Sequence, residues 1–367
     1  MSYITAIGTA NPAYKIKQSV IADFMVKAMG LTYQNERRLR SLFRSSGIDY
    51  RFSVLKDYSR DSGYEFFPDN ENLEPFPSTE KRVQEFRQHA LPLSLGAIKN
   101  ALPGEDFNSI THLIVVCCTG MYAPGLDIDI IKALRLPTDI QRVCINFMGC
   151  YAAINALQTG DAFCRANPSA KVLIVCTELC SLHFQKEPTD DNLLSNALFG
   201  DGSAAVIMET QKPKTTSLRP LKFYNDLLFK GEHDMAWNIG NFGFEMRLSS
   251  YVPNLIEKGI KDLADSLFKG ISIDQESVQY FAIHPGGKKI LSTIERELNI
   301  SEEQNKYAHH VLRNYGNMSS PSVLFVLNEI FRMLSSGDDK KHVLSFAFGP
   351  GLTLGSLLLE VNGGEHE

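Results

Sequence analysis

The sequence predicts an α/β fold, because short apolar runs alternate along the chain with longer segments of helical periodicity. Most of these runs are continuous rather than alternating apolar and polar, which is typical of strands covered by helices on both faces. The chain has 367 residues, which exceeds the size at which a single hydrophobic core usually stops growing. We therefore expect two packed units or a duplicated fold.

Six apolar runs are predicted to form buried strands, and three amphipathic segments are predicted to form helices. The strands span residues 112–118, 171–178, 203–209, 278–284, 342–348 and 352–360. One helix spans 79–102, with Thr79 as its N-cap. The others span 252–270 and 321–337, and each has a proline in its first turn and a glycine at its end. Residues 57–78 are turn-rich and are expected to form an irregular surface excursion.

A weak internal repeat suggests that the chain consists of two similar halves. Residues 198–210 and 347–361 each combine a glycine turn with an apolar strand. Residues 210–220 are polar and contain two prolines, which is typical of a connector. We therefore place the first half at residues 1–215 and the second at residues 216–367.

Composition and charge exclude several classes of protein. The net charge is −5 and the isoelectric point is about 6.0, so no global basic field predicts a nucleic-acid partner. The first twenty residues lack the charged start and long apolar core of a signal peptide. No apolar run reaches the ~18 residues that a membrane helix requires. We expect a cytoplasmic protein without a membrane span.

The chain has seven cysteines, and most of them are predicted to be small buried side chains. Cys117, Cys118, Cys144 and Cys176 lie in apolar strand-like runs. No histidine or cysteine pair follows at metal-ligand spacing, so no metal site is predicted. Without a secretory signal, we expect no disulfides.

Cys150 is the candidate nucleophile. It follows Gly149 and precedes an alanine-rich segment that is predicted to be helical. The exposed N–H groups of a helix N-terminus stabilise a thiolate and lower the pKa of the cysteine. From this segment alone, a buried structural thiol remains an open alternative.

His284 and Asn317 are the candidate partners of Cys150. His284 ends an apolar strand before a Pro-Gly-Gly turn, where a ligand can approach and where a thiol can find a proton acceptor. Asn317 precedes the helix predicted at 321–337, and its amide can donate to a developing oxyanion. Taken singly, a satisfied imidazole and a helix cap are the alternatives.

Six segments, in this order, give the chain an end-to-end resemblance to a known family. They are AIGTANP (6–12), GCYAA (149–153), LFGDGSAA (198–205), IHPGGKKIL (283–291), YGNMSSPSVLFVL (315–327) and FGPGLT (348–353). The chain resembles the type III polyketide synthases, the chalcone synthase-like branch of the thiolase superfamily. The resemblance implies a thiolase-like fold in which two similar α/β halves form a layered αβαβα arrangement.

The resemblance also implies a reaction. Cys150 would hold an acyl-CoA starter as a thioester, and His284 and Asn317 would stabilise the enolate formed when malonyl-CoA loses CO₂. The extended chain would then cyclise to a pyrone, resorcinol or phloroglucinol. The enzyme would be an acyltransferase and a homodimer, with CoA thioesters as substrates and no further cofactor.

In the family, residues of the cavity set the choice of starter. The positions implied here are Phe199, His183, Met246, Ser319 and Ala123. Several of them depart from the plant pattern: a histidine replaces a threonine at position 183, and a methionine replaces a phenylalanine at position 246. A phenylpropanoid starter is therefore doubtful, and a fatty-acyl or small aliphatic starter is as plausible.

CoA carries phosphates, so a basic mouth is expected. Arg37, Arg40 and Arg44 share one face of a predicted helix by their i, i+3, i+7 spacing, although a solvated face is the alternative. The family binds CoA near this segment and near the turn after the histidine. The resemblance thus implies CoA contacts by Arg44, Arg51, Gly286, Gly287 and Lys288, while Asp49 replaces a lysine found in relatives.

Two rival functions remain. An initiating β-ketoacyl-ACP synthase would use the same triad on a carrier protein, but such enzymes usually have HQAN where this chain has HPGG. A noncatalytic partner subunit on the thiolase fold would usually lack the nucleophile. Malonyl-CoA and malonyl-ACP assays separate these alternatives.

Overall fold

The computed structural model describes residues 1–70, 72–104, 107–249 and 251–364. Within these residues the strands are β1 (Tyr3–Ala10), β2 (Tyr14–Lys17), β3 (Tyr50–Ser53), β4 (His112–Cys117), β5 (Gln141–Asn146), β6 (Lys171–Leu179), β7 (Asp201–Glu209), β8 (Ser217–Leu227), β9 (Met235–Gly240), β10 (Gly243–Leu248), β11 (Tyr280–Ile283), β12 (His342–Gly349) and β13 (Thr353–Asn362). The helices are α1 (Gln18–Met29), α2 (Tyr33–Ser45), α3 (Thr79–Ala101), α4 (Leu126–Leu134), α5 (Ala152–Ala166), α6 (Asp190–Leu198), α7 (Val252–Phe268), α8 (Lys288–Leu298), α9 (Lys306–Tyr315) and α10 (Pro321–Phe331).

The main sheet repeats one pairing pattern on its two sides. Its strand order is β11-β12-β13-β8-β1-β7-β6-β4-β5. On one side β1 and β6 are antiparallel to β7, and β4 is parallel to β6. On the other side β8 and β12 are antiparallel to β13, and β11 is parallel to β12. The two sets meet where Ile4 pairs with Leu218. The α/β class and the similarity of the two halves are confirmed, while the boundary at residue 215 remains a prediction.

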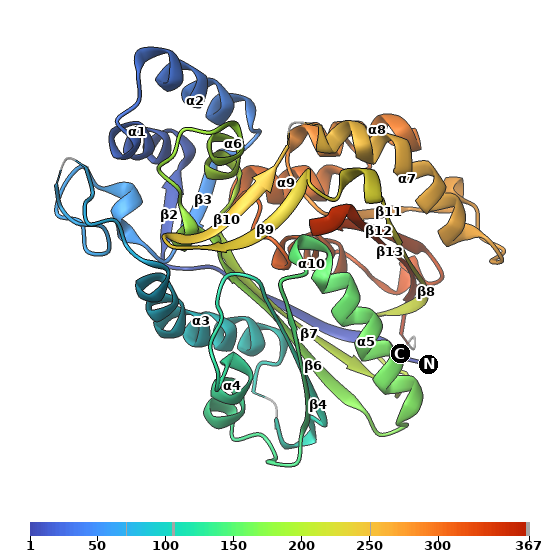
Figure 1. The fold of residues 1–367 in the computed structure, drawn as a ribbon. Coiled ribbons are helices and arrows are strands. Elements are labelled where there is room, and N and C mark those ends of the chain that lie inside the picture. The colour runs from blue at the N-terminus through green and yellow to red at the C-terminus, as the bar shows by residue number, and fades with distance from the viewer. Residues whose placement is uncertain (71, 105–106, 250, 365–367) are drawn as a thin grey trace.

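Helices lie in layers around these strands (Figure 1). Helix α3 packs on β1, β6 and β7, and α7 packs on β8 and β13 with α8 beside it. Helices α5 and α10 contact strands of both sets. The strands are therefore covered on both faces: Leu113 and Val115 of β4 belong to one hydrophobic cluster, and Ile114 and Val116 belong to the other. Helix α5 begins directly after the turn that carries Cys150, and α10 begins shortly after Asn317, so the starts of these two helices position the candidate site.

Two predicted helix ends differ from the structure. The N-cap of α3 is Ser78, whose hydroxyl accepts from the backbone N–H of Lys81. Thr79 instead ties α3 to the β9–β10 hairpin, because its hydroxyl donates to the carbonyl of Gly240 and accepts from the N–H of Gly243. Helix α10 ends at Phe331 rather than residue 337, because a separate short 3-10 helix begins after the cap residue Ser335.

The predicted connector at 210–220 is partly a strand. Residues 217–220 belong to β8, which pairs with β13. Pro220 lies within this strand, at the point where the register shifts between Leu358 and Leu359. A bulge of this kind accommodates a residue that cannot donate to the ladder.

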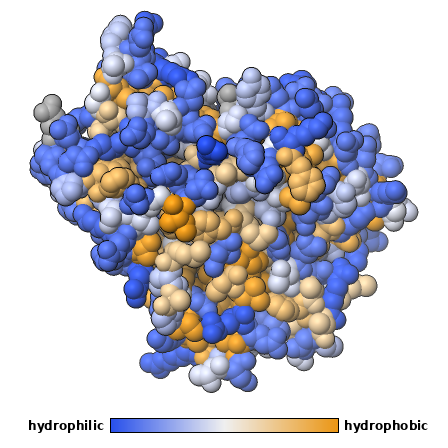
Figure 2. Space-filling view, viewed as in Figure 1, coloured by the Kyte–Doolittle hydropathy of each residue, from blue (hydrophilic) through white to orange (hydrophobic). Residues whose placement is uncertain are grey.

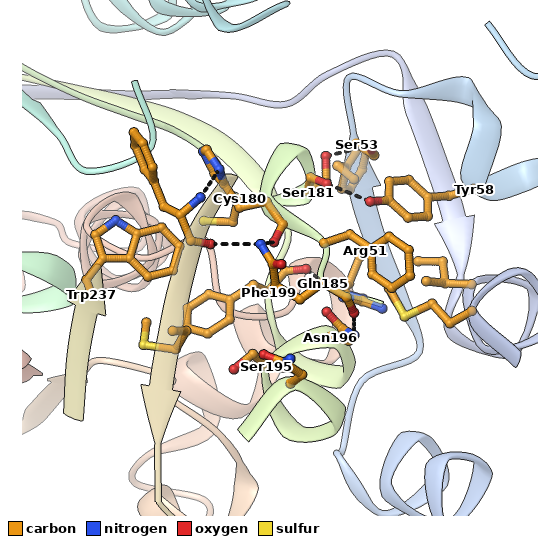
Figure 3. Close-up of a pocket in the computed structure, with 18 residues that line it drawn as sticks. Arg51, Ser53, Tyr58, Cys180, Ser181, Gln185, Ser195, Asn196, Phe199 and Trp237 are labelled. Atoms are coloured by element: carbon orange, nitrogen blue, oxygen red, sulfur yellow. Dashed lines mark hydrogen bonds between the residues drawn. The ribbon is translucent and has the colours of Figure 1, made fainter. Parts of the chain in front are cut away.

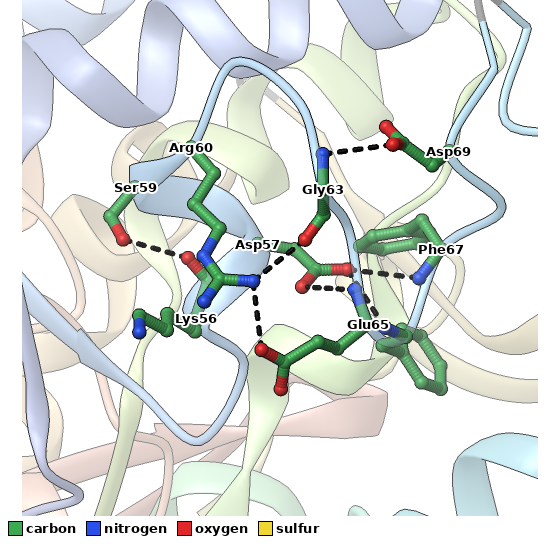
Figure 4. Close-up of polar contacts among 9 residues, drawn as sticks. Lys56, Asp57, Ser59, Arg60, Gly63, Glu65, Phe67 and Asp69 are labelled. Carbon is green, nitrogen blue, oxygen red and sulfur yellow. Dashed lines mark hydrogen bonds and ion pairs between the residues drawn. The ribbon is translucent and has the colours of Figure 1, made fainter.

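The segment predicted as a surface excursion is irregular but anchored inside the protein (Figure 4). The carboxylate of Asp57 accepts from the backbone N–H groups of Glu65, Phe66 and Phe67, at 2.9–3.0 Å. The side chains of Phe66 and Phe67 are buried and join an aromatic cluster with Phe76. The turn-rich composition gave the irregular backbone correctly, but the aromatic rings make the segment part of the core.

Cys144 is exposed, contrary to the prediction, whereas Cys117, Cys118 and Cys176 are buried. The difference arises because β5 is the edge strand of the main sheet and three of its other residues are also exposed. An apolar run at a sheet edge has no further strand or helix to cover it.

Candidate active site

Cys150 lies in a short 3-10 turn, Gly149–Tyr151, directly before α5. The turn packs tightly against the loop between β12 and β13. A Cβ at Gly149, which has φ +72°, would lie 2.3 Å from Cδ of Pro350. A Cβ at Gly349 would likewise lie 2.3 Å from the ring of Tyr151. Glycines in both loops thus let the second half of the chain close over the turn that carries the thiol.

His284 follows β11 and is buried with its ring against Gly286. A Cβ at Gly286 would lie 3.4 Å from Cδ2 and 3.6 Å from Nε2 of the imidazole. The Nε2 edge of the ring therefore faces Gly286. Nδ1 is buried and has no hydrogen-bond partner among the described residues. Burial lowers the pKa of His284 to about 3, so the imidazole is neutral.

Asn317 connects the nucleophile to the segment after the histidine. Its Oδ1 accepts from the backbone N–H of Ser319 at 2.8 Å, which fixes the orientation of the amide. The same Oδ1 accepts from the thiol of Cys150 at 3.8 Å, and Nδ2 donates to the carbonyl of Gly286 at 3.4 Å. The structure thus brings Cys150, Asn317 and the turn after His284 together, although they are far apart in sequence.

The expected lowering of the Cys150 pKa is wrong for this structure. Burial raises the pKa of the thiol to about 12, and the negative charge of Glu178 acts in the same direction. Contacts with the side chains of Ser319 and Asn317 oppose the rise without cancelling it. Desolvation outweighs the helix N-terminus, so both the thiol of Cys150 and the imidazole of His284 are neutral.

Glu178 is a buried carboxylate that the sequence analysis missed. It accepts from the N–H of Cys118 at 2.9 Å, from the hydroxyl of Thr119 at 2.6 Å and from the hydroxyl of Ser320 at 3.0 Å. Burial raises its pKa to about 7. Its position at the end of an apolar strand was the only available signal, and such a position does not reveal whether partners exist.

The side chains of His183, Trp237 and Phe244 form a wall of three rings. His183 stacks on Phe244, with ring centroids 4.4 Å apart and planes 8° apart, and it meets Trp237 edge-on at 5.7 Å. Nε2 of His183 bonds the carbonyl of Thr119 at 2.8 Å, and Nδ1 accepts from the N–H of Phe244 at 2.9 Å. Each ring is therefore held by hydrogen bonds or stacking, and the wall is rigid.

This wall borders an inner cavity of about 50 Å³ (Figure 3). The inner cavity also reaches α1, β3 and α6, and Phe199 and Met246 line it with the three rings. Three of the predicted cavity residues, His183, Phe199 and Met246, thus line one cavity. Ser319 lies beside Cys150 and Asn317 instead, and Ala123 lines a separate surface hollow next to Cys144.

A surface cleft of about 320 Å³ lies beside the Gly286 turn. It is bounded by α2, α6, the start of α7 and residues 286–290. Gly286, Gly287 and Lys288 line this surface cleft, as do two cations that the sequence analysis missed, Arg38 and Lys289. Arg38 forms an ion pair of 2.6 Å with Asp190 of α6.

The two predicted arginine contacts lie elsewhere. Arg44 lines a different hollow, with Arg40 and Lys17. Arg51 has only 4% of its surface exposed, which contradicts its assignment to a CoA mouth. The sequence spacing identified a charged face of α2. A different face of the helix, with Arg38, Leu42 and Ser45 at i, i+4 and i+7, lines the surface cleft.

No group of three or more histidine, cysteine or acidic side chains in the described part of the chain is arranged to hold a metal ion. The helices within the described ranges are all too short or too polar to cross a membrane.

Residues 1–212 match the family described as chalcone and stilbene synthases, N-terminal domain, and residues 223–362 match the C-terminal domain of the same family. The chain belongs to the chalcone and stilbene synthase family. It is a type III polyketide synthase with a thiolase-like fold, and enzymes of this kind are condensing acyltransferases that use CoA thioesters.

Similar proteins cover almost the whole chain. The alpha-pyrone synthesis polyketide synthase-like Pks18 of Mycobacterium tuberculosis is 31% identical over 368 residues, which is 98% of this chain and 91% of that protein. The crystal structure of PKS-I from the brown alga Ectocarpus siliculosus superimposes with a TM-score of 0.90 at 29% identity, covering 98% of each chain. The C-terminal type III polyketide synthase domain of Steely1 from Dictyostelium gives a TM-score of 0.89 at 29% identity, covering 99% of each chain.

Proposed function

We propose that Cys150 carries the acyl chain and that His284 is its proton acceptor. When an acyl-CoA thioester approaches, the proton of Sγ moves to Nε2 of His284 as sulfur attacks the carbonyl. The bond between the carbonyl carbon and the CoA sulfur then breaks, and CoA leaves as its thiolate, which takes a proton from water, so Nε2 keeps the proton from Sγ. The neutral pair suits this order of events, because the charges form only when substrate has displaced water from the site. The orientation of the Nε2 edge toward Gly286 supports the choice of nitrogen.

Decarboxylation of malonyl-CoA then generates the carbon nucleophile. The thioester oxygen becomes an enolate oxygen as CO₂ leaves, and it needs hydrogen-bond donors at fixed positions. Asn317 Nδ2 is such a donor, because its present bond to Gly286 is long and can be exchanged for one to the enolate. Nε2–H of His284 supplies the second. One donor of this kind contributes about 2.7–4 kcal/mol, and a carboxylate at position 317 would repel the enolate.

The surface cleft is the proposed site for the phosphate and pantetheine parts of CoA. Arg38, Lys288 and Lys289 supply positive charge, and the apolar side chains of Leu194 and Leu248 supply a lining for the arm. The cleft ends at Gly286 and Gly287, next to the triad. A thioester held there would reach Cys150 across the two glycines.

A short aliphatic starter fits the inner cavity best. Its volume of about 50 Å³ corresponds to about three to five water molecules, and the ring wall leaves little freedom to enlarge it. A phenylpropanoid starter would require displacement of at least one hydrogen-bonded ring. With few extensions, cyclisation would give an alkylpyrone, and the name of the Pks18 relative supports a pyrone product.

The convergence of Cys150, Asn317 and the His284–Gly286 turn is the observation on which this proposal rests. Incubation of the purified protein with labelled malonyl-CoA and a series of acyl-CoAs, followed by mass spectrometry, tests it. We expect pyrones from short acyl groups. Products formed only from malonyl-ACP would favour the ketoacyl synthase alternative, and no decarboxylation at all would favour a noncatalytic subunit.

The enzyme is further proposed to be a cytoplasmic homodimer. The edge strand β5 and the hollow of about 730 Å³ beside it carry exposed Met121 and Cys144. Figure 2 shows apolar surface over the lower half of the view, around α4, β4 and α5. A second copy would cover this surface, and sedimentation velocity tests for it. All seven cysteines are free in the structure.

A further inference from the structure

Arg51 is a buried guanidinium whose hydrogen bonds lead toward the catalytic amide (Figure 3). Its Nε donates to Oε1 of Gln18 at 2.8 Å, and its Nη1 donates to the carbonyl of Phe199 at 2.6 Å. Nη2 is buried without a partner among the described residues, and no carboxylate in that part of the chain forms an ion pair with Arg51. Burying a guanidinium costs free energy of desolvation, and the attraction of buried Asp201 offsets only part of that cost, so the hydrogen bonds of Arg51 call for an explanation other than stability.

Phe199 is the middle residue of the segment that holds Asn317. The N–H of Asn317 donates to the carbonyl of Leu198 at 2.9 Å, and its carbonyl accepts from the N–H of Gly200 at 2.9 Å. Phe199 and Asn317 thus form a bridge of parallel type. Arg51 donates to the carbonyl of Phe199, which is not the carbonyl that bonds Asn317. Arg51 therefore holds the segment from the side opposite to Asn317.

The aliphatic part of Arg51 fills the space beside the two bridged segments. A Cβ at Gly316 would lie 2.9 Å from Cγ of Arg51 and 2.8 Å from the carbonyl of Leu198. A Cβ at Gly200 would lie 3.4 Å from Cβ of Arg51. Both glycines are direct neighbours of the bridged residues, so any shift of Arg51 is transmitted to the backbone of Asn317.

We propose that Arg51 is a positioning residue that fixes the amide of Asn317 through the carbonyl of Phe199. This inference rests on the proposed role of Asn317 as an enolate donor. A donor displaced by about 1 Å can lower a rate by about 100-fold. Arg51 therefore influences the decarboxylation step through the carbonyl of Phe199, although it also lines the inner cavity, and it has no part in binding CoA.

The test combines Arg51→Lys with Asn317→Ala and measures CO₂ release from carboxyl-labelled malonyl-CoA. We expect Arg51→Lys to lower kcat by about tenfold, with KM changed less than about twofold, because lysine keeps the charge but lacks the fork. In the Asn317→Ala background the same change is expected to have no further effect, since the amide that it positions is gone.

Arg82→Lys is the matched control, because Arg82 is also a fully buried guanidinium with an unpartnered Nη2, but it bonds the carbonyls of Pro77, Leu182 and Phe184. Arg82→Lys is expected to lower kcat by the same factor in the enzyme with Asn317 and in the Asn317→Ala enzyme. If Arg51→Lys unfolds the protein in thermal melts, Gln18→Ala loosens Nε instead and should lower kcat about threefold, again only when Asn317 is present.

Equal losses from Arg51→Lys in both backgrounds, or no loss in either, would overturn the positioning role. A fully active Asn317→Ala enzyme would instead overturn the proposed function, so the two failures are distinguishable.

Discussion

The two halves of the molecule repeat one scaffold but place different chemistry on it. Cys150 stands before α5 in the first half, and Asn317 stands before α10 in the second. Each follows a glycine with positive φ, +72° at Gly149 and +69° at Gly316. Each glycine packs against the opposite half, Gly149 on Pro350 and Gly316 on the carbonyl of Leu198.

We call the turns before α5 and α10, which carry Cys150 and Asn317, the two corners. The comparison shows that the shared backbone of the two corners brings these side chains close together, whereas the side chain in each corner determines its chemistry. A thiol at one corner can form a covalent bond, and an amide at the other can only donate and accept hydrogen bonds. The two halves are thus similar in the backbone that holds the side chain and different in the reaction that the side chain can perform. Five experiments test that division, and they are ordered by the size of the expected effect.

Cys150→Ala should remove the function of the first corner alone. We expect product formation to fall by about 10³-fold or more, because no thioester can form. Malonyl-CoA decarboxylation should persist, because His284 and Asn317 remain. Product analysis and CO₂ release on the same sample measure both activities. Parallel loss of the two would show that the corners do not act separately.

Asn317→Ala should remove the function of the second corner. CO₂ release is expected to fall by about 10²–10³-fold, as for other oxyanion donors, while acylation of Cys150 by acyl-CoA persists. Intact-protein mass spectrometry follows the acylation. His284→Ala is the companion variant, and it should impair both steps because the imidazole serves both. An Asn317→Ala enzyme that neither acylates nor decarboxylates would contradict the assignment.

Gly149→Ala and Gly316→Ala should damage the two corners equally. Each adds a Cβ to a backbone with positive φ and against an atom of the other half, so we expect a loss of about 2–4 kcal/mol in the free energy of unfolding. Gly270→Ala is the matched control, since Gly270 has φ +80° with open space around it and should lose only about 1 kcal/mol. Denaturant unfolding measures the free energy of unfolding of all three variants. A loss at Gly270→Ala as large as at Gly149→Ala and Gly316→Ala would refute the close approach of the two halves.

The pH dependence of Cys150 alkylation should show the neutral pair. The pKa of the thiol is about 12 and that of His284 about 3, so neither titrates near neutrality. The thiolate fraction, and the rate with iodoacetamide, should rise about tenfold per pH unit from about pH 6 to about pH 9. Peptide mapping distinguishes Cys150 from exposed Cys144. A plateau across this range would reveal a thiolate–imidazolium pair.

Stability should respond to the same His284 shift in acid. Its folded pKa lies below the ordinary value of 6.5, so the unfolded chain binds the proton more readily. The contribution of neutral His284 is therefore full above about pH 6.5 and falls as the pH drops toward 3. His284→Gln should flatten this part of the stability profile.

The α/β class, the buried strands and the candidates Cys150, His284 and Asn317 followed from the sequence. Apolar period, glycine turns and motif order depend on neighbours a few residues away, so they can be read along the chain. The arginines of α2 show the limit: the spacing singled out Arg44, but Arg44 lines a different hollow, and Arg38 is the arginine of α2 that lines the surface cleft. Which face turns inward depends on where α6 and α7 lie.

The sequence by itself determined which elements form and which side chains can react. Only the tertiary structure decided that Arg51 is enclosed, that Cys144 is exposed and that burial raises rather than lowers the pKa of Cys150. These properties are set by desolvation and by contacts such as that between Arg51 and Phe199, which are 148 positions apart. Local pattern carries no record of such contacts, because they exist only after the two halves have packed together.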